Sequence, residues 1–114
     1  MRSDKDRILD ILEAVKKIEK YAAAGRDRFY SDELVQVWMT QQIQIIGEAA
    51  SRLSDELKEN HPEISWEKII AMRNILVHSY FKVDPDEIWA VIIKDIPEIK
   101  PKINALPDVL PDSD

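Results

Sequence analysis

Apolar residues recur at steps of three and four along most of this 114-residue chain, and no stretch alternates apolar and polar residues with a period of two. A three- to four-residue repeat places apolar side chains on one face of an α-helix, whereas a half-buried β-strand needs the alternating pattern. The first such repeat consists of Ile8, Ile11, Leu12, Val15 and Ile18. The sequence therefore predicts an all-α fold in which each helix buries one face.

Polar capping residues divide this pattern into four main helices. Serine or aspartate at an N-cap accepts a hydrogen bond from a free backbone N–H of the first turn. Four such residues precede apolar repeats, namely Ser3, Ser31, Ser65 and Asp84. The second helix is expected to continue to about Asn60. Helices joined in this order predict an up-and-down bundle of four to five helices.

The two glycines and the C-terminal tail carry further expectations. Gly25 predicts the end of the first helix, because glycine adopts a positive φ at low cost. Gly47 lies inside the second helix, where glycine costs about 1 kcal/mol relative to alanine, and this predicts close approach of another helix. Residues 1–106 are expected to form one helical domain. The tail 107–114 has three aspartates and no basic residue, and is predicted to be disordered.

The bulk composition narrows the possible functions. The absence of cysteine excludes disulfides and thiolate metal sites, and two widely separated histidines predict no metal site. No cofactor is expected. No apolar run could span a bilayer and the charged N-terminus does not resemble a signal peptide, so we expect a cytoplasmic protein without membrane contact. The net charge of −6 argues against a large RNA-binding face, although not against a small catalytic cleft.

The most reactive set of side chains lies between Arg73 and Tyr80, in the sequence Arg-Asn-Ile-Leu-Val-His-Ser-Tyr. A guanidinium group matches phosphate oxygens and stays charged, and an imidazole can exchange a proton near neutral pH. His78 could take the proton from a ribose 2′-hydroxyl while Arg73 stabilises charge on the phosphate. Asn74 could orient His78 from one helical turn away. Together these groups could cleave RNA without a metal ion, although an exposed arginine and a histidine at a helix end can also be purely structural.

Arg73 and His78 do not converge easily if both lie on one straight helix. Five residues at about 100° each place them about 140° apart around the helix axis. Either the helix breaks before His78, or a second copy of the chain supplies the missing counterpart. A two-fold dimer would bring the same segment in from both subunits, so the sequence predicts a site in a cleft on the dimer axis or a helix break.

The spacing Arg73-x4-His78-x-Tyr80 resembles the Arg-x4-His-x-Tyr motif of the HEPN superfamily. The stretches Ile46-Gly47-Glu48-Ala49, Ile88-Trp89 and Asp95-Ile96-Pro97 are similar to its HepT branch. The resemblance implies a HEPN-like homodimer or higher oligomer with the motif in the dimer cleft. It also implies a metal-independent endoribonuclease that acts as the toxin of a type VII-like toxin–antitoxin module.

The resemblance further implies a partner, a minimal nucleotidyltransferase (MNT) antitoxin that transfers AMP to Tyr80. An added phosphodiester would bring negative charge and bulk to a site suited to RNA phosphate. Two other functions remain open. In one, the chain is a non-catalytic helical binding or accessory subunit of a minimal nucleotidyltransferase, and the motif serves docking and modification. In the other, it is an oligomerisation domain in which Arg73 and His78 are structural.

Overall fold

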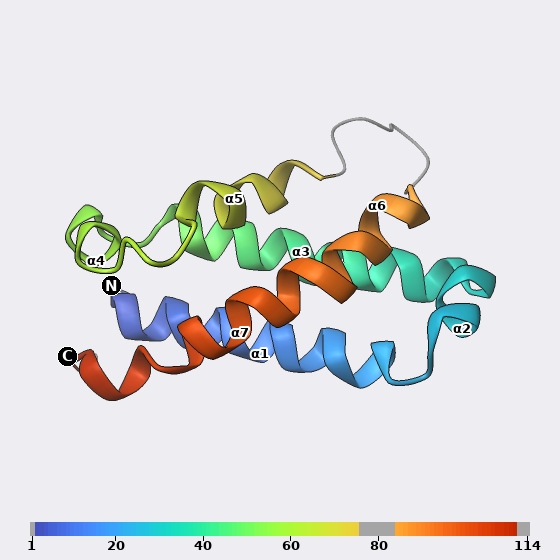
Figure 1. The fold of residues 1–114 in the computed structure, drawn as a ribbon, viewed down its shortest axis with the longest axis horizontal. Coiled ribbons are helices and arrows are strands. Elements are labelled where there is room, and N and C mark those ends of the chain that lie inside the picture. Colours follow the sequence, from blue (N-terminus) through green and yellow to red (C-terminus); the bar gives the residue numbers. More distant parts are fainter. Residues whose placement is uncertain (1, 76–83, 112–114) are drawn as a thin grey trace.

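The computed structural model describes residues 2–75 and 84–111, and every regular element within these ranges is helical. The two longest helices, α1 (Asp4–Ala22) and α3 (Glu33–Ser51), pack side by side in opposite directions (Figure 1). The shorter elements are α2 (Arg26–Ser31), α4 (Asp55–Asn60), α5 (Trp66–Ala71), the 3₁₀ turn η1 (Met72–Asn74), α6 (Pro85–Ala90), the π-helix η2 (Val91–Asp95), α7 (Ile96–Asn104) and the 3₁₀ turn η3 (Pro107–Val109). The prediction of an all-α fold is confirmed. Within the described ranges, none of the helices has both the length and the apolar character that crossing a bilayer requires.

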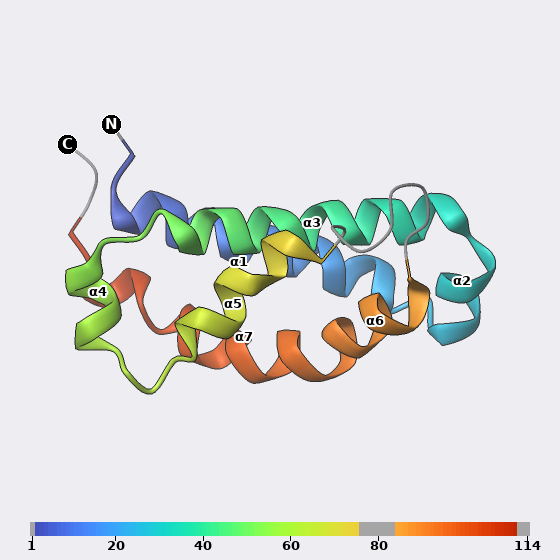
Figure 2. The ribbon, with the colours of Figure 1, turned by 90° about the horizontal axis from the view of Figure 1, so that it is seen from above.

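The core lies between the α1–α3 pair and a continuous helical run formed by α6, η2 and α7 (Figures 1 and 2). The apolar face predicted for the first helix is buried, although Leu12 is only partly covered. The other large core side chains include Met39, Ile43, Ile46, Ile96, Ile99 and Ile103. Because helices of about six residues are not stable alone in water, burial against the two long helices is what keeps the short ones folded.

The first helix begins as predicted. Ser3 and Asp6 form a reciprocal capping box, in which each side chain accepts a 3.1 Å hydrogen bond from the backbone N–H of the other. This contact satisfies two backbone donors that a helix start otherwise leaves free.

The connection between α1 and α3 differs from the prediction. Gly25 has the expected positive φ of 95°, but a short helix, α2, follows it directly. The hydroxyl of Ser31 donates a hydrogen bond back to the carbonyl of Arg28 in this helix. Asp32 therefore caps α3, and its carboxylate accepts from two backbone N–H groups of the first turn. The expected N-cap at Ser31 is thus wrong by one residue.

The predicted long second helix is wrong at its C-terminal end. α3 stops at Ser51, and a separate helix, α4, runs from Asp55 to Asn60. Ser54 caps α4 by accepting from a backbone N–H of its first turn. The backbone N–H and the hydroxyl of Ser54 also donate to the carboxylate of Asp4 at the start of α1. This long-range contact ties the turn between α3 and α4 to the start of α1.

The described part of the predicted tail, residues 107–111, begins with a short helical turn. Pro107–Val109 forms η3, and Leu110 packs partly buried against the core. The expectation of a disordered tail stays a prediction.

Candidate active site

Arg73 lies on η1, directly after α5, where that helix tightens into a 3₁₀ turn. The preceding residue, Met72, is buried in the core, whereas Arg73 and Asn74 are exposed. A 3₁₀ turn has three residues per turn, so one inward side chain is followed by two that face outward. Within the described residues Arg73 makes no ion pair with a carboxylate.

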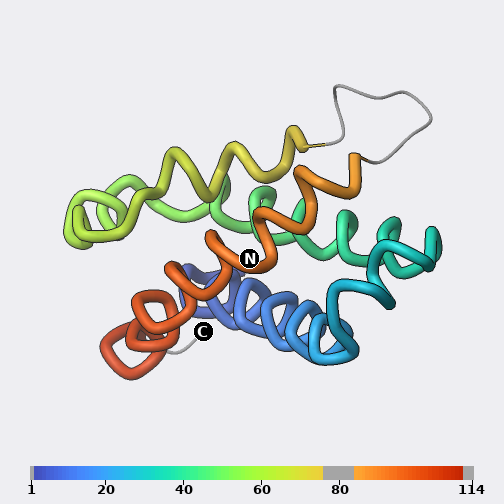
Figure 3. Tube along the Cα trace, turned by 45° about the vertical axis from the view of Figure 1, so that its right-hand side comes forward, coloured from blue at the N-terminus to red at the C-terminus, as the bar shows by residue number. Residues whose placement is uncertain are grey.

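The backbone of Arg73 rests on α3 at Gly47. A β-carbon built on Gly47 would lie 2.2 Å from the backbone nitrogen of Arg73 and 2.9 Å from its Cα. The expectation of a close approach at Gly47 is confirmed. In Figure 2 the end of α5 lies over the middle of α3, and Figure 3 shows the yellow-green α5 segment on one side of the green α3, with which α5 and η1 are in contact.

Contacts between α2 and α6 fix the position of α6, the first described element after residue 83. The Tyr30 hydroxyl donates to Asp86 at 2.7 Å, and the rings of Phe29 and Trp89 lie 5.1 Å apart between centroids. The guanidinium of Arg26 lies 4.7 Å from the centre of the Tyr30 ring. The hydrogen bond to the Asp86 carboxylate raises the pKa of Tyr30 above its ordinary value, because it favours the neutral phenol. α6 therefore starts from a defined position beside α2.

Two predicted site residues, His78 and Tyr80, lie outside the described residues. The N-cap predicted at Asp84 is confirmed, since its carboxylate accepts from the backbone N–H groups of Asp86 and Glu87. The relative orientation of Arg73 and His78 stays a prediction.

A cavity of about 320 Å³ adjoins Asn74. Its lining residues come from α5, η1, α6 and η2, and are Lys68, Ala71, Met72, Asn74, Ile75, Glu87, Val91 and Asp95. The ammonium of Lys68 lies 3.0 Å from Asp95 and 3.6 Å from Glu98, and the bond to Asp95 raises the pKa of Lys68. Sequence reasoning missed these charged residues, because they come from separate segments that only the tertiary fold brings together.

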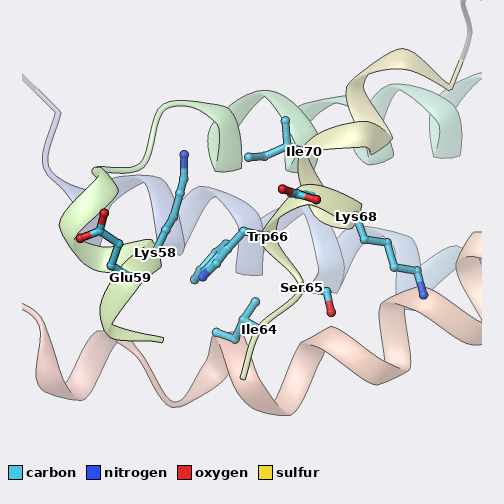
Figure 4. A pocket seen from close by; sticks show the side chains of 8 residues that line it. Lys58, Glu59, Ile64, Ser65, Trp66, Lys68 and Ile70 are labelled. Atoms are coloured by element: carbon cyan, nitrogen blue, oxygen red, sulfur yellow. The ribbon is translucent and has the colours of Figure 1, made fainter. Parts of the chain in front are cut away.

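A larger cavity of about 620 Å³ lies between α4 and α5, around Trp66 (Figure 4). The Trp66 indole N–H donates to the carbonyl of His61 at 3.0 Å, and the imidazole of His61 lies 3.2 Å from Glu63. Neither Arg73 nor Asn74 lines this cavity. We therefore place the candidate site at η1, which carries Arg73 and Asn74, rather than in the larger cavity around Trp66.

Within residues 2–75 and 84–111, no group of three or more histidine, aspartate or glutamate side chains is arranged to hold a metal ion. The groups placed at the site by the described residues are a guanidinium and an amide, both exposed on η1. Both donate hydrogen bonds to anionic oxygens, and an arginine fork matches phosphate geometry.

A family comparison and a search for similar proteins both lead to the same family. Residues 11–106 match the family described as ribonuclease HepT-like. A Thermococcus cleftensis protein named as a probable ribonuclease HepT is 37% identical over 106 residues, which cover 92% of this chain and 96% of that protein.

Two Methanocaldococcus jannaschii proteins are also similar. One, whose name gives gamma-glutamylcyclotransferase together with a candidate RNase, is 38% identical over 90% of this chain and 47% of its own length. The other, named as a candidate RNase, is 27% identical over 90% of this chain and 94% of its own length. No solved structure matches the chain. The family match over most of the sequence, together with the relatives, shows that the chain belongs to the ribonuclease HepT-like family.

Proposed function

We propose that this ribonuclease cleaves RNA without a metal ion, with Arg73 and His78 as catalytic residues and Asn74 in support. His78 takes the proton from a ribose 2′-hydroxyl, and the oxygen attacks the adjacent phosphorus. The bond from phosphorus to the 5′-oxygen breaks as the new bond forms, and the leaving oxygen takes up a proton. Arg73 stabilises the negative charge that develops on the phosphate oxygens.

The observation that carries this proposal is the state of Arg73. Its backbone is held against α3 at Gly47, while its side chain is exposed and, within the described residues, free of carboxylate partners. Arginines on a protein surface often pair with neighbouring acids, as Arg52 does with Glu48 here. An arginine whose backbone is held in place and whose positive charge is not paired with a carboxylate suits an external phosphate.

A homodimer is part of the proposal, because the motif resemblance implies a site in a cleft between two copies of the chain. An apolar stripe on the outer face of α3 supports it. Leu34, Val37 and Ile45 follow one another at helical spacing on this face, and all three are exposed. A second copy that covered this stripe would bury apolar surface that a monomer leaves in water.

An RNA cleavage assay with EDTA present, and with DNA as a second substrate, tests the function directly. The purified chain should cut a single-stranded RNA in the presence of EDTA and leave the DNA of the same sequence intact, because DNA lacks the attacking 2′-hydroxyl. The products should carry 2′,3′-cyclic phosphate ends, which mass spectrometry detects. An RNA substituted with a single 2′-deoxynucleotide is the matched control, and cutting at that position would contradict the mechanism.

We also propose that the chain is the toxin of a toxin–antitoxin pair and that a minimal nucleotidyltransferase inactivates it by adenylylating Tyr80. Support comes from the motif resemblance and from the position of Tyr80, seven residues after Arg73. Co-expression with a minimal nucleotidyltransferase should add one AMP to the peptide that contains Tyr80, and the modified protein should lose RNase activity. Tyr80→Phe is the control. If the wild-type peptide stays unmodified, this part of the proposal fails.

The net charge of −6 favours a second candidate, a non-catalytic accessory subunit of the nucleotidyltransferase. An acidic protein is repelled by RNA outside any local cationic site. This candidate predicts a stable complex with the nucleotidyltransferase and no RNA cleavage at any protein concentration. The EDTA assay separates the two functions.

A further inference from the structure

We propose that Gly47 is a positioning residue for Arg73. The missing side chain at this point of α3 lets the backbone of η1 lie directly on the helix, and this contact sets where the guanidinium group is presented. The inference rests on the proposed function in that it treats Arg73 as catalytic.

The geometry at Gly47 leaves no room for a side chain. A β-carbon there would lie 2.2 Å from the Arg73 nitrogen, 2.9 Å from its Cα and 2.9 Å from its Cβ. All three distances are shorter than those that β-carbons adopt in proteins. The obstructing atoms are backbone and Cβ, so rotation of a side chain cannot relieve the contact. One of the two backbones would have to move.

A glycine is needed at position 47 because a side chain there would collide with η1, and not because the backbone has a positive φ. Within the described residues, Gly25 is the one residue with a positive φ, and nothing lies within 4 Å of a β-carbon built on it. Gly47 has ordinary helical geometry and is crowded instead. A glycine inside a helix costs about 1 kcal/mol relative to alanine, and α3 accepts this cost at the point that touches Arg73.

η1 is the partner that would give way. α3 packs along α1 over most of its length, and the neighbours of Gly47 on α3, Ile46 and Ala50, are fully buried. η1 is three residues long, and Met72 alone of them is buried. A methyl group at position 47 would therefore push Arg73 outward rather than bend α3. A displacement of about 1 Å at a catalytic group can cost about 10²-fold in rate.

The principal variant is Gly47→Ala. We expect it to lower kcat for RNA cleavage by about 10²-fold with a much smaller change in KM. A control for general destabilisation is Glu13→Gly, which puts a glycine into the interior of α1 at an exposed position. It should lower Tm through the helix cost of about 1 kcal/mol and leave kcat close to that of the wild type.

A double-mutant cycle shows whether the effect passes through Arg73. If it does, Gly47→Ala slows the wild type but causes little further loss in Arg73→Ala, because the group that it misplaces is already gone. Equal losses in the two backgrounds would overturn the positioning role, since they would show that Gly47 acts on folding or on another group.

A readout that needs no activity separates this inference from the proposed function. The chain has no cysteine, so Arg73→Cys introduces a unique thiol that can carry a spin label. Adding Gly47→Ala should change the mobility of that label, and adding Glu13→Gly should not. If the wild type cuts no RNA but the label responds, the proposed function fails and the placement by Gly47 stands. An unchanged label overturns the placement.

If Gly47→Ala does not fold, the wild type still provides a test. The close contact requires a strong nuclear Overhauser effect between the α-protons of Gly47 and the amide proton of Arg73. Observation of this effect supports the inference, and its absence in a folded, assigned protein overturns it.

Discussion

Replacement of Arg73 by alanine should lower the rate of RNA cleavage by about 10²- to 10³-fold, which is the usual cost of removing one preorganised donor from a charge-stabilising site. The fold should survive, because the side chain is exposed and, among the described residues, forms no ion pair. Single-turnover cleavage of a labelled RNA measures the rate, and circular dichroism checks the fold. Arg52→Ala, at another exposed arginine, is the matched control.

His78→Ala in the same assay should cost about 10²- to 10⁴-fold, the range for loss of a general base. The two single variants then allow a test of where the site lies. If Arg73 of one copy works with His78 of the other, mixing the two inactive variants restores about a quarter of the wild-type rate, because about half of the dimers are mixed and each has one intact site. Mixtures that stay inactive would show that both groups act within one chain. Undiminished cleavage by either single variant would contradict its catalytic role.

Phe29→Ala should destabilise the protein by about 3–5 kcal/mol, the cost of removing a fully buried phenylalanine. Phe29 is 1% exposed and packs against the rings of Trp89 and Tyr30 at centroid distances of 5.1 and 5.3 Å. The loss is a large part of the total stability of a domain this size. Thermal or urea unfolding measures it.

The control for this variant is Val109→Ala on η3, outside the apolar stripe of α3. Val109 is 67% exposed, so its truncation should change the free energy of unfolding by no more than about 0.5 kcal/mol. A Phe29→Ala variant that unfolds at the wild-type temperature would mean that α2 is not part of the cooperative core.

Local chemistry explains which parts of the fold could be predicted. The Ser3–Asp6 capping box involves residues three apart, and Gly47 is conspicuous in a helical pattern, so both were visible in the sequence. Ser31 and Asp32 are both good N-caps, and local pattern cannot choose between them. The choice is made by α2, which engages the Ser31 hydroxyl and leaves Asp32 for α3.

The rest depends on contacts between distant segments. The turn between α3 and α4 is tied to α1 by a bond between Ser54 and Asp4, which no periodicity reveals. At the site, sequence reasoning identified Arg73 and Asn74 from residue chemistry, and the structure places both on the exposed side of η1. It could not find the pair of Lys68 and Asp95 in the adjoining cavity, since α5 and η2 meet only in the folded chain.

The bond between Asp4 and Ser54 also bears on how the chain matures during its synthesis. α1 leaves the ribosome first, but the partner of its first turn is made 50 residues later. Closing that contact alone would cost the entropy of a long loop. The packed α1–α3 hairpin already brings the two ends together and removes most of that cost. The first half of the chain, rather than the first helix, is therefore the smallest nascent unit that contains both partners of this contact.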